Sequence, residues 1–264
     1  MSDEVMFPNF RVDGKVALIT GGNRGIGRAC ALSLANAGAN IVIIDRDLKM
    51  PEKIIKEIEK LGSKAMALNF DITEYSRIPE TVKMIFNKFG KIDILINNAG
   101  VCFRELALEV SEKTWDNTFN VNLKGLFFIT KEVAKFMIEK KKGKIINISS
   151  MNSITGLIGH ASYNASKAGI IGLTQVLAME WARYGINVNS IAPTFTNTEM
   201  ASHVFKNKDK YNEIINNIPL RRLADPMEIG ATAVFLASPA SDFITGTLLL
   251  VDGGWTAGKE LKNV

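Results

Sequence analysis

Short apolar runs alternate with longer amphipathic stretches along nearly the whole chain, and this alternation constrains the fold more than any other feature. Seven runs are predicted as strands, over residues 16–19, 40–44, 65–70, 92–96, 144–148, 187–191 and 248–251. Their apolar residues are continuous rather than alternating with polar ones, which indicates strands that are covered on both faces. Six helices are predicted between them, over residues 26–37, 51–61, 77–89, 112–140, 163–184 and 226–236.

Repeated strand–helix units with right-handed crossovers predict an α/β fold: a doubly wound, parallel, seven-stranded sheet of the Rossmann type with helices on both faces. Proline at 51 and 226 suits the first turn of a helix, and glycine at 38, 62, 90 and 185 suits the end of one. No linker or internal repeat interrupts the pattern, so we expect one domain over residues 1–264. The weakly periodic stretch at about 193–219 is long for a loop and is predicted to be a substrate lid.

Composition narrows the classes of partner. The chain has 264 residues, 47% of them hydrophobic, and a mild formal net charge of +5. We therefore expect no nucleic-acid partner, and no apolar run approaches the length that crosses a membrane. The N-terminus has no apolar signal segment, and two cysteines (Cys30 and Cys102) imply no disulfide framework, so a cytoplasmic location is expected. The two histidines, His160 and His203, have no metal-ligand spacing, so no metal site is predicted.

A glycine-rich turn, TGGNRGIG at residues 20–27, lies between the first predicted strand and the first predicted helix. Its glycines permit a tight turn, close approach of the backbone to a ligand and close helix packing. The N-terminus of the helix offers N–H groups and a positive dipole end to a pyrophosphate. We therefore predict a dinucleotide cofactor bound by Gly21, Asn23, Arg24, Gly25, Ile26 and Gly27.

An acidic residue follows at the spacing expected for a ribose contact. Asp45 ends the second predicted strand, 18 residues after Gly27. Its carboxylate can accept hydrogen bonds from the adenosine ribose hydroxyls and would repel a 2′-phosphate. Arg24 and Arg46 argue the other way, because either side chain could pair with that phosphate. We expect NAD rather than NADP, since an arginine can swing into solvent whereas a carboxylate at the ribose opposes a dianion.

Two further segments follow predicted strands at the edge of the sheet where such folds bind ligands. Asp71 and Ile72 are expected to bracket the adenine, the carboxylate with its amine and the isoleucine against its ring. In the sequence NNAG, Asn98, Ala99 and Gly100 are small enough to let the backbone approach the cofactor.

A tyrosine and a lysine in the sequence YNASK predict proton-transfer chemistry. Tyr163 and Lys167 are spaced i and i+4, which brings them to one face of a helix. An ammonium group beside a phenol favours the phenolate, so we expect Lys167 to lower the pKa of Tyr163. Ser150, 13 residues earlier, can hold the alcohol or ketone oxygen of a substrate. Asn122 lies in an otherwise apolar helical stretch, where its amide must find a partner or a water.

Together these segments resemble the short-chain dehydrogenase/reductase family. The resemblance spans residues 14–254 and rests on TGGNRGIG, FDI, NNAG, NVNLKG, NISS, YNASK, APTFTNT and VDGG. It implies an NAD(P)-dependent oxidoreductase acting on CH–OH groups, with Tyr163 as acid/base, Lys167 on the nicotinamide ribose, Ser150 on the substrate oxygen and Asn122 holding a relay water. The 13-residue spacing selects Ser150 over Ser149. A catalytically idle nucleotide-binding protein on the same fold is the alternative from another class.

The resemblance also extends the set of expected cofactor contacts to Tyr163, Lys167, Pro193, Thr196 and Thr198. The family pattern Pro-Gly is replaced here by Pro193-Thr194. A β-branched residue would be strained at positive φ, so we expect the loop to take a shape that threonine tolerates.

The segment after NNAG and the ending VDGGWTAG resemble family members that act on sugar acids, such as gluconate 5-dehydrogenase and 2-dehydro-3-deoxygluconate 5-dehydrogenase. Arg104 is a candidate for a substrate carboxylate, and Asn152 and His160 are candidates for hydroxyl contacts, beside Ser150 and Tyr163. A sugar acid or polyol is therefore expected, with a 3-oxoacyl thioester or another ketone as the alternative. Helices that are apolar on more than one face, and the family's habit, predict a homotetramer.

Overall fold

The computed structural model describes residues 7–48, 51–202 and 207–258. Seven parallel strands form one sheet in the order β3-β2-β1-β4-β5-β6-β7. The strands are β1 (Val16–Thr20), β2 (Asn40–Asp45), β3 (Ala65–Asn69), β4 (Ile94–Asn97), β5 (Gly143–Ile148), β6 (Ile186–Pro193) and β7 (Leu248–Val251). The predicted fold class is confirmed, and every predicted strand is present with its ends shifted by no more than a few residues.

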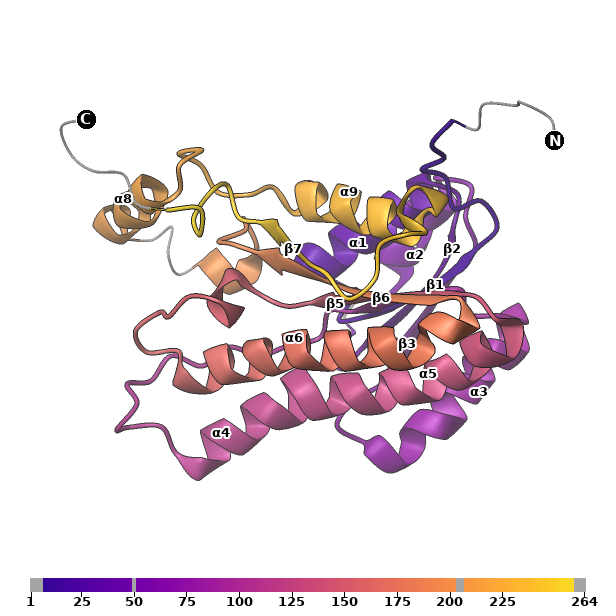
Figure 1. Ribbon diagram of the computed structural model, residues 1–264, viewed down its shortest axis with the longest axis horizontal. Coiled ribbons are helices and arrows are strands. Elements are labelled where there is room, and N and C mark those ends of the chain that lie inside the picture. The colour runs from indigo at the N-terminus through magenta and orange to yellow at the C-terminus, as the bar shows by residue number, and fades with distance from the viewer. Residues whose placement is uncertain (1–6, 49–50, 203–206, 259–264) are drawn as a thin grey trace.

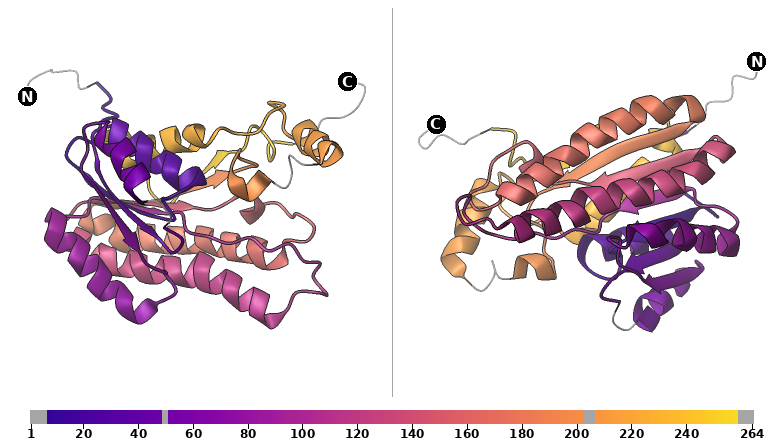
Figure 2. Two further views of the ribbon diagram at one scale, coloured as in Figure 1. Left: turned by 180° about the vertical axis from the view of Figure 1, so that it is seen from behind. Right: turned by 90° about the horizontal axis from the view of Figure 1, so that it is seen from below.

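Helices cover both faces of this sheet (Figures 1 and 2). One face is covered by α1 (Gly25–Asn36), α2 (Pro51–Glu59) and α9 (Pro226–Ala237). The other is covered by α3 (Ile78–Phe89), α5 (Leu126–Lys140) and α6 (Ala161–Trp181), with α4 (Glu112–Phe119) beside α6. Short α8 (Lys208–Asn217) lies apart from both layers, beyond the end of the sheet (Figure 1).

The continuous apolar strands supply two separate cores. In β1, Ala17 and Ile19 pack on the side of α1 and α9, whereas Val16 and Leu18 pack on the side of α3 and α5. Successive side chains of a strand point to opposite faces of the sheet, so both sets must be apolar when both faces are covered. This explains why the strand runs show no alternation with polar residues.

The strand order reverses direction between β1 and β4, where the chain first builds outwards to β3 and then returns to the other side of β1. Ligands bind open α/β sheets at such a switch point, outside the carboxyl ends of the strands. The glycine-rich turn after β1 and the Asn98 loop after β4 meet there.

One helical prediction needs correction. The helix expected over residues 112–140 is interrupted by a π-helical turn, η2 (Asn120–Gly125), which separates α4 from α5. In the stretch expected to be a lid, the structure has a short 3-10 turn, η5 (Glu199–Ala201), and the unpredicted helix α8, while residues 203–206 lie outside the described residues. Among the described helices, none has both the length and the apolar character needed to cross a bilayer.

Candidate active site

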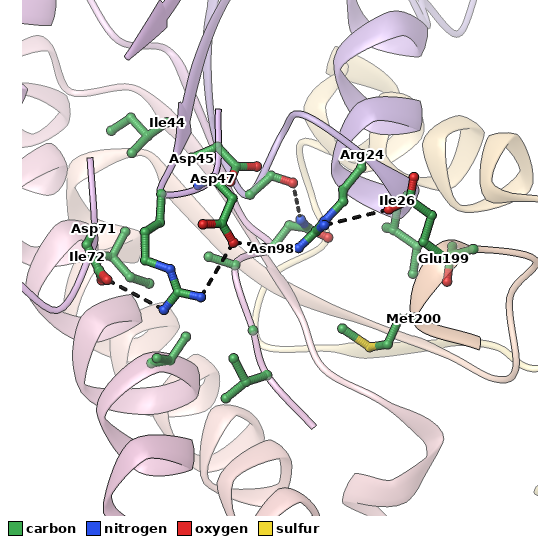
Figure 3. A pocket seen from close by; sticks show the side chains of 18 of the residues that line it. Arg24, Ile26, Ile44, Asp45, Asp47, Asp71, Ile72, Asn98, Glu199 and Met200 are labelled. Carbon is green, nitrogen blue, oxygen red and sulfur yellow. Dashed lines mark hydrogen bonds and ion pairs between the residues drawn. The ribbon is translucent and has the colours of Figure 1, made fainter. Parts of the chain in front are cut away.

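The loops that follow β1, β2, β3 and β4 enclose a cavity of about 210 Å³ at the switch point (Figure 3). Eleven of the residues predicted to bind the dinucleotide line it: Gly21, Arg24, Gly25, Ile26, Asp45, Arg46, Asp71, Ile72, Asn98, Ala99 and Gly100. A twelfth predicted residue, Thr198, lines the same cavity from the segment after β6. Residues that were predicted from their spacing in the sequence thus meet here from five separate segments.

The glycine-rich turn is packed too tightly for side chains. A Cβ atom at Gly27 would lie 2.1 Å from the carbonyl oxygen of Gly21, and one at Gly21 would lie 2.9 Å from Nδ2 of Asn98. The Asn98 amide explains this closeness, because its Nδ2 donates to the carbonyl oxygens of Thr20 and Gly21 over 3.1 and 2.8 Å. Gly27 itself is buried and does not line the cavity, and its lack of a side chain lets the start of α1 pack closely against the turn and Asn98.

The N-terminus of α1 fits an anionic ligand. Its N-cap residue, Arg24, is extended and provides no side-chain hydrogen bond to the first turn, and that turn contains no acidic residue. The first N–H groups of a helix need an acceptor, and the dipole favours a negative one. The residues present thus fit the pyrophosphate of a dinucleotide.

At the far end of the cavity, Asp45 is held in place by backbone amides. Its Oδ2 accepts from the N–H of Asn23 over 3.2 Å and its Oδ1 from the N–H of Asp47 over 3.0 Å. Asn23 therefore orients Asp45 by its backbone instead of lining the cavity.

Both arginines at this end are engaged by carboxylates (Figure 3). Arg46 lies 3.6 Å from Asp47 Oδ2 and 3.6 Å from Asp71 Oδ2. Arg24 lies 3.9 Å from Asp47 Oδ2 and 3.6 Å from Oε2 of Glu199 in η5.

A second cavity, of about 360 Å³, adjoins the first and shares Ile26, Asn98, Gly100, Thr198 and Met200 with it. Ser150, Tyr163 and Lys167 line it together, and so do the expected cofactor residues Pro193 and Thr196. The rival Ser149 also lies at this wall, but its hydroxyl donates to the backbone oxygen of Lys167 over 2.9 Å. That bond occupies the Ser149 proton, whereas the Ser150 hydroxyl accepts from the N–H of Asn152 over 3.2 Å and lowers the pKa of Tyr163.

The expected direction of the Tyr163 pKa shift is wrong for this structure. Burial raises the pKa of the phenol well above its ordinary value, and a negative charge on the Cys102 thiolate raises it further, while the Ser150 hydroxyl lowers it less. The Lys167 ammonium points instead to the carbonyl oxygen of Ile148, 2.7 Å away, and its Nζ is 5.8 Å from the centre of the Tyr163 ring. Burial lowers the pKa of Lys167 to about 8.

Asn122 lies behind the cavity rather than in it. Its side chain is fully buried in the π-helical turn, accepts from the N–H of Val101 over 2.8 Å, and donates to the Val101 carbonyl and the Ser166 hydroxyl over 2.9 and 3.0 Å. Gly100 connects it to the site, since a Cβ there would lie 3.3 Å from Asn122 Oδ1 and 3.6 Å from Lys167 Nζ. The amide thus fixes the loop that follows β4.

The comparisons with known proteins agree with this geometry. A family profile described as enoyl-(acyl carrier protein) reductase matches residues 21–256. The chain belongs to the short-chain dehydrogenase/reductase family. It is 43% identical over 249 residues to the 2-dehydro-3-deoxy-D-gluconate 5-dehydrogenase of Dickeya dadantii, covering 94% of this chain and 98% of that one.

Two other relatives are described with different cofactors. The chain is 40% identical over 250 residues to the NAD-dependent glycerol dehydrogenase of Listeria innocua, covering 94% of this chain and 96% of that one. The structure of a gluconate 5-dehydrogenase from Burkholderia cenocepacia, in complex with NADP and tartrate, superposes with a TM-score of 0.92 at 37% identity, covering 96% of this chain and 99% of that one.

The departure from the short-chain dehydrogenase/reductase pattern at Thr194 is accommodated as expected. Among the described residues, only Lys141 and Arg221 have positive φ without being glycine, so Thr194 is unstrained. Its hydroxyl contacts the sulfur of Met151 at 3.0 Å, and its carbonyl accepts from the Thr196 hydroxyl over 3.0 Å.

The candidate substrate residues Arg104, Asn152 and His160 all line the second cavity. Sequence reasoning missed the contribution of α8, which presents Lys210, Glu213 and Asn217 to the same space. It also missed Cys102, Met151, Phe195, Met200 and Trp255. The spacing i, i+3, i+7 of the polar residues on α8 was the available signal, but it indicates one helix face and not what that face meets.

Proposed function

We propose that this protein is an oxidoreductase that transfers a hydride between NAD(H) and a secondary alcohol or ketone, with a sugar acid as substrate. The observation that carries the proposal is that Ser150, Tyr163 and Lys167 line one cavity, which is continuous with the cavity lined by the glycine-rich turn. A site for a dinucleotide and a site for proton transfer thus share a wall.

In this proposal, the nicotinamide supplies the hydride chemistry when it is bound. The chain's own residues manage the oxygen and the proton. Tyr163 is protonated near neutrality, because burial raises its pKa, and its phenol can give the proton to a carbonyl oxygen in the reducing direction. In the oxidising direction the phenolate takes the proton from the carbinol. The Ser150 hydroxyl orients that oxygen, and the Lys167 ammonium favours the phenolate in the low-dielectric cavity.

The proposed role of Asn122 is positional. Family membership suggests a relay water at this asparagine, and the π-helical turn that contains it is a rare feature that is frequent at functional sites. Its contacts with Val101 and Ser166 support a role in fixing the Gly100 loop against Lys167.

NAD is proposed as the cofactor because the ribose end of the cavity is acidic. Asp45 is oriented by two backbone N–H groups, and Arg24 and Arg46 both lie within 4 Å of carboxylates. An NADP 2′-phosphate would have to displace these ion pairs and approach Asp45. The relatives do not decide this point, since one is named for NAD and the other holds NADP.

A sugar acid is proposed as substrate because the second cavity carries cations and hydrogen-bonding groups above the Tyr163 phenol. Arg104 and Lys210 offer positive charge to a carboxylate, while Asn152 and Asn217 offer amides to hydroxyls. The names of the Dickeya and Burkholderia relatives, and the tartrate in the latter, fit an acidic polyhydroxylated substrate.

A homotetramer is proposed for the assembly. Between α4, η2 and α6 runs a mostly apolar groove of about 500 Å³, lined by residues that include Phe119, Leu123, Phe127 and Leu173. Val176, which lines this groove, and Met179 of the same helix are 53% and 83% exposed, so α6 presents apolar side chains on this face. Sedimentation at micromolar concentration tests this, and a stable monomer would contradict it.

Turnover of a panel of sugar acids, polyols and oxo-esters with NAD and with NADP tests the activity. Tyr163→Phe should abolish turnover and retain NADH binding, because only the phenolic oxygen is removed. Tyr184→Phe is the matched control, since Tyr184 lies past the far end of α6 and away from both cavities. A Tyr163→Phe enzyme that oxidises its substrate at the wild-type rate would refute the assigned chemistry.

A further inference from the structure

Arg24 lies at the mouth of the cofactor cavity, between carboxylates of two different segments. It is the N-cap residue of α1, its side chain is 61% exposed, and it lines the cavity together with Asp45 and Arg46. One guanidinium nitrogen lies 3.9 Å from Asp47 Oδ2 and the other 3.6 Å from Glu199 Oε2 (Figure 3). The side chain is therefore shared between the strand side of the cavity and the segment after β6.

Glu199 reaches this position because its segment lies on the glycine-rich turn. A Cβ atom added at Gly25 would lie 3.4 Å from the Thr198 side chain. Thr198 therefore lies directly against the glycine-rich turn. Thr198, Glu199 and Met200 all line the cofactor cavity. The Arg24–Glu199 pair thus joins the segment after β6 to the turn after β1 across the opening of this cavity.

The charges at this opening are unbalanced. Four carboxylates line the cavity, those of Asp45, Asp47, Asp71 and Glu199, and they face two guanidinium groups. Arg46 is held by Asp47 and Asp71, whereas Arg24 pairs with Asp47 and with Glu199 of the segment after β6. A 2′-phosphate needs an arginine, and Arg24 can serve it only by leaving Glu199 and Asp47.

We propose that Glu199 is a positioning residue for cofactor choice: by pairing with Arg24, it withholds this guanidinium from a 2′-phosphate and so favours NAD over NADP. The inference rests on the proposed dinucleotide-linked function. Neither ribose hydroxyl of NAD requires a cation, so the Arg24–Glu199 pair does not weaken the binding of NAD. Glu199 acts through Arg24 and adds its own negative charge against a phosphate dianion.

Binding of NADH and NADPH to the wild type and to Glu199→Gln, followed by nicotinamide fluorescence without substrate, tests this. Removing one exposed charge is worth little by itself, so we expect the NADPH Kd to fall about three- to tenfold while the NADH Kd stays within about twofold. Asp209→Asn in α8 is the matched control, because it removes a carboxylate from the same segment away from Arg24 and should leave both constants unchanged. Glu199→Lys should strengthen NADPH binding further than Glu199→Gln does.

The double variant Arg24→Met/Glu199→Gln separates the mechanism from a general charge effect. If Glu199 acts through Arg24, the gain in NADPH affinity seen for Glu199→Gln should largely disappear in the Arg24→Met background. An unchanged ratio of NADPH to NADH affinity in Glu199→Gln, an equal change in Asp209→Asn, or a full gain without Arg24 would each overturn the inference while leaving the proposed function intact. A wild type that binds neither nucleotide would overturn both.

Discussion

The ammonium group of Lys167 donates a hydrogen bond to the carbonyl oxygen of Ile148 over 2.7 Å, which joins the middle of α6 to the last residue of β5. The side chain is only 5% exposed, and among the described residues no carboxylate forms an ion pair with it. A buried ammonium without a counter-ion is costly, and here it sits at the wall of the candidate active site. We therefore propose that Lys167 serves chemistry rather than stability.

Lys167 should make the free energy of unfolding depend on pH in the alkaline range. Its folded-state pKa of about 8 lies below the unfolded value of about 10.4, so the folded state binds fewer protons between these values. Folding is penalised below pH 8, and the free energy of unfolding should rise with pH towards 10.4, by about 1.4 kcal/mol per unit at most. Urea unfolding of wild type and Lys167→Met at pH 7 and pH 9.5 measures the difference. Lys208→Met, on the exposed side of α8, keeps Lys167 and should therefore show the same rise with pH as the wild type. Parallel profiles for wild type and Lys167→Met would contradict the prediction.

The rate of alcohol oxidation should also rise with pH. Because burial raises the pKa of Tyr163, the fraction of phenolate is small at pH 7 and grows about tenfold per unit of pH. Oxidation needs the phenolate and ketone reduction needs the phenol, so below pH 8, where Lys167 keeps its charge, kcat/KM for oxidation should climb with pH while that for reduction stays nearly level. A deuterated alcohol identifies conditions in which hydride transfer limits the rate. Level oxidation under those conditions would show that another group accepts the proton.

The strands could be predicted closely because strands that are covered on both faces consist of continuous apolar residues, which are visible in the sequence. The helix expected over residues 112–140 could not be divided correctly, since its apolar pattern continues through the π-helical turn. What widens that turn is not visible in the spacing. Asn122 is held there by Val101, which follows a different strand.

The candidate site could be predicted where residues lie at or just after the end of a strand, as Asp45 and Asp71 do. Residues whose role depends on how the segment after β6 lies over the sheet were not predictable. Glu199 and Lys210 line the cavities, and the segment that carries them is anchored where Ile214 of α8 and the following Ile218 pack into a small apolar cluster with Phe195. The pKa of Tyr163 was predicted in the wrong direction because spacing shows a neighbouring lysine but not the depth of burial.

Gly27→Ala should weaken both the fold and the binding of NADH. A Cβ at this position would lie 2.1 Å from the Gly21 carbonyl oxygen and 2.4 Å from Asn98 Nδ2, so the turn or the Asn98 amide must move. Overpacking of this kind costs about 1–3 kcal/mol. We expect that loss in thermal or urea unfolding, with NADH affinity lowered about tenfold or more. Gly156→Ala, where a Cβ meets no heavy atom within 4 Å, is the control, and an unaffected Gly27→Ala protein would show that the turn is not tightly packed.

Lys210→Met should separate substrate binding from chemistry. Lys210 is half-buried on the face of α8 that meets the second cavity, and among the described residues no carboxylate lies within ion-pair distance of its ammonium. If this charge binds the carboxylate of a sugar acid, its loss should raise KM for that substrate about tenfold, while kcat stays within about twofold, because methionine keeps the length of the side chain. A neutral secondary alcohol should be oxidised as before. Lys208→Met removes the same charge from the outer side of α8 and should change neither constant. An equal rise in KM for the neutral alcohol would mean that Lys210 shapes the cavity rather than recognising the acid.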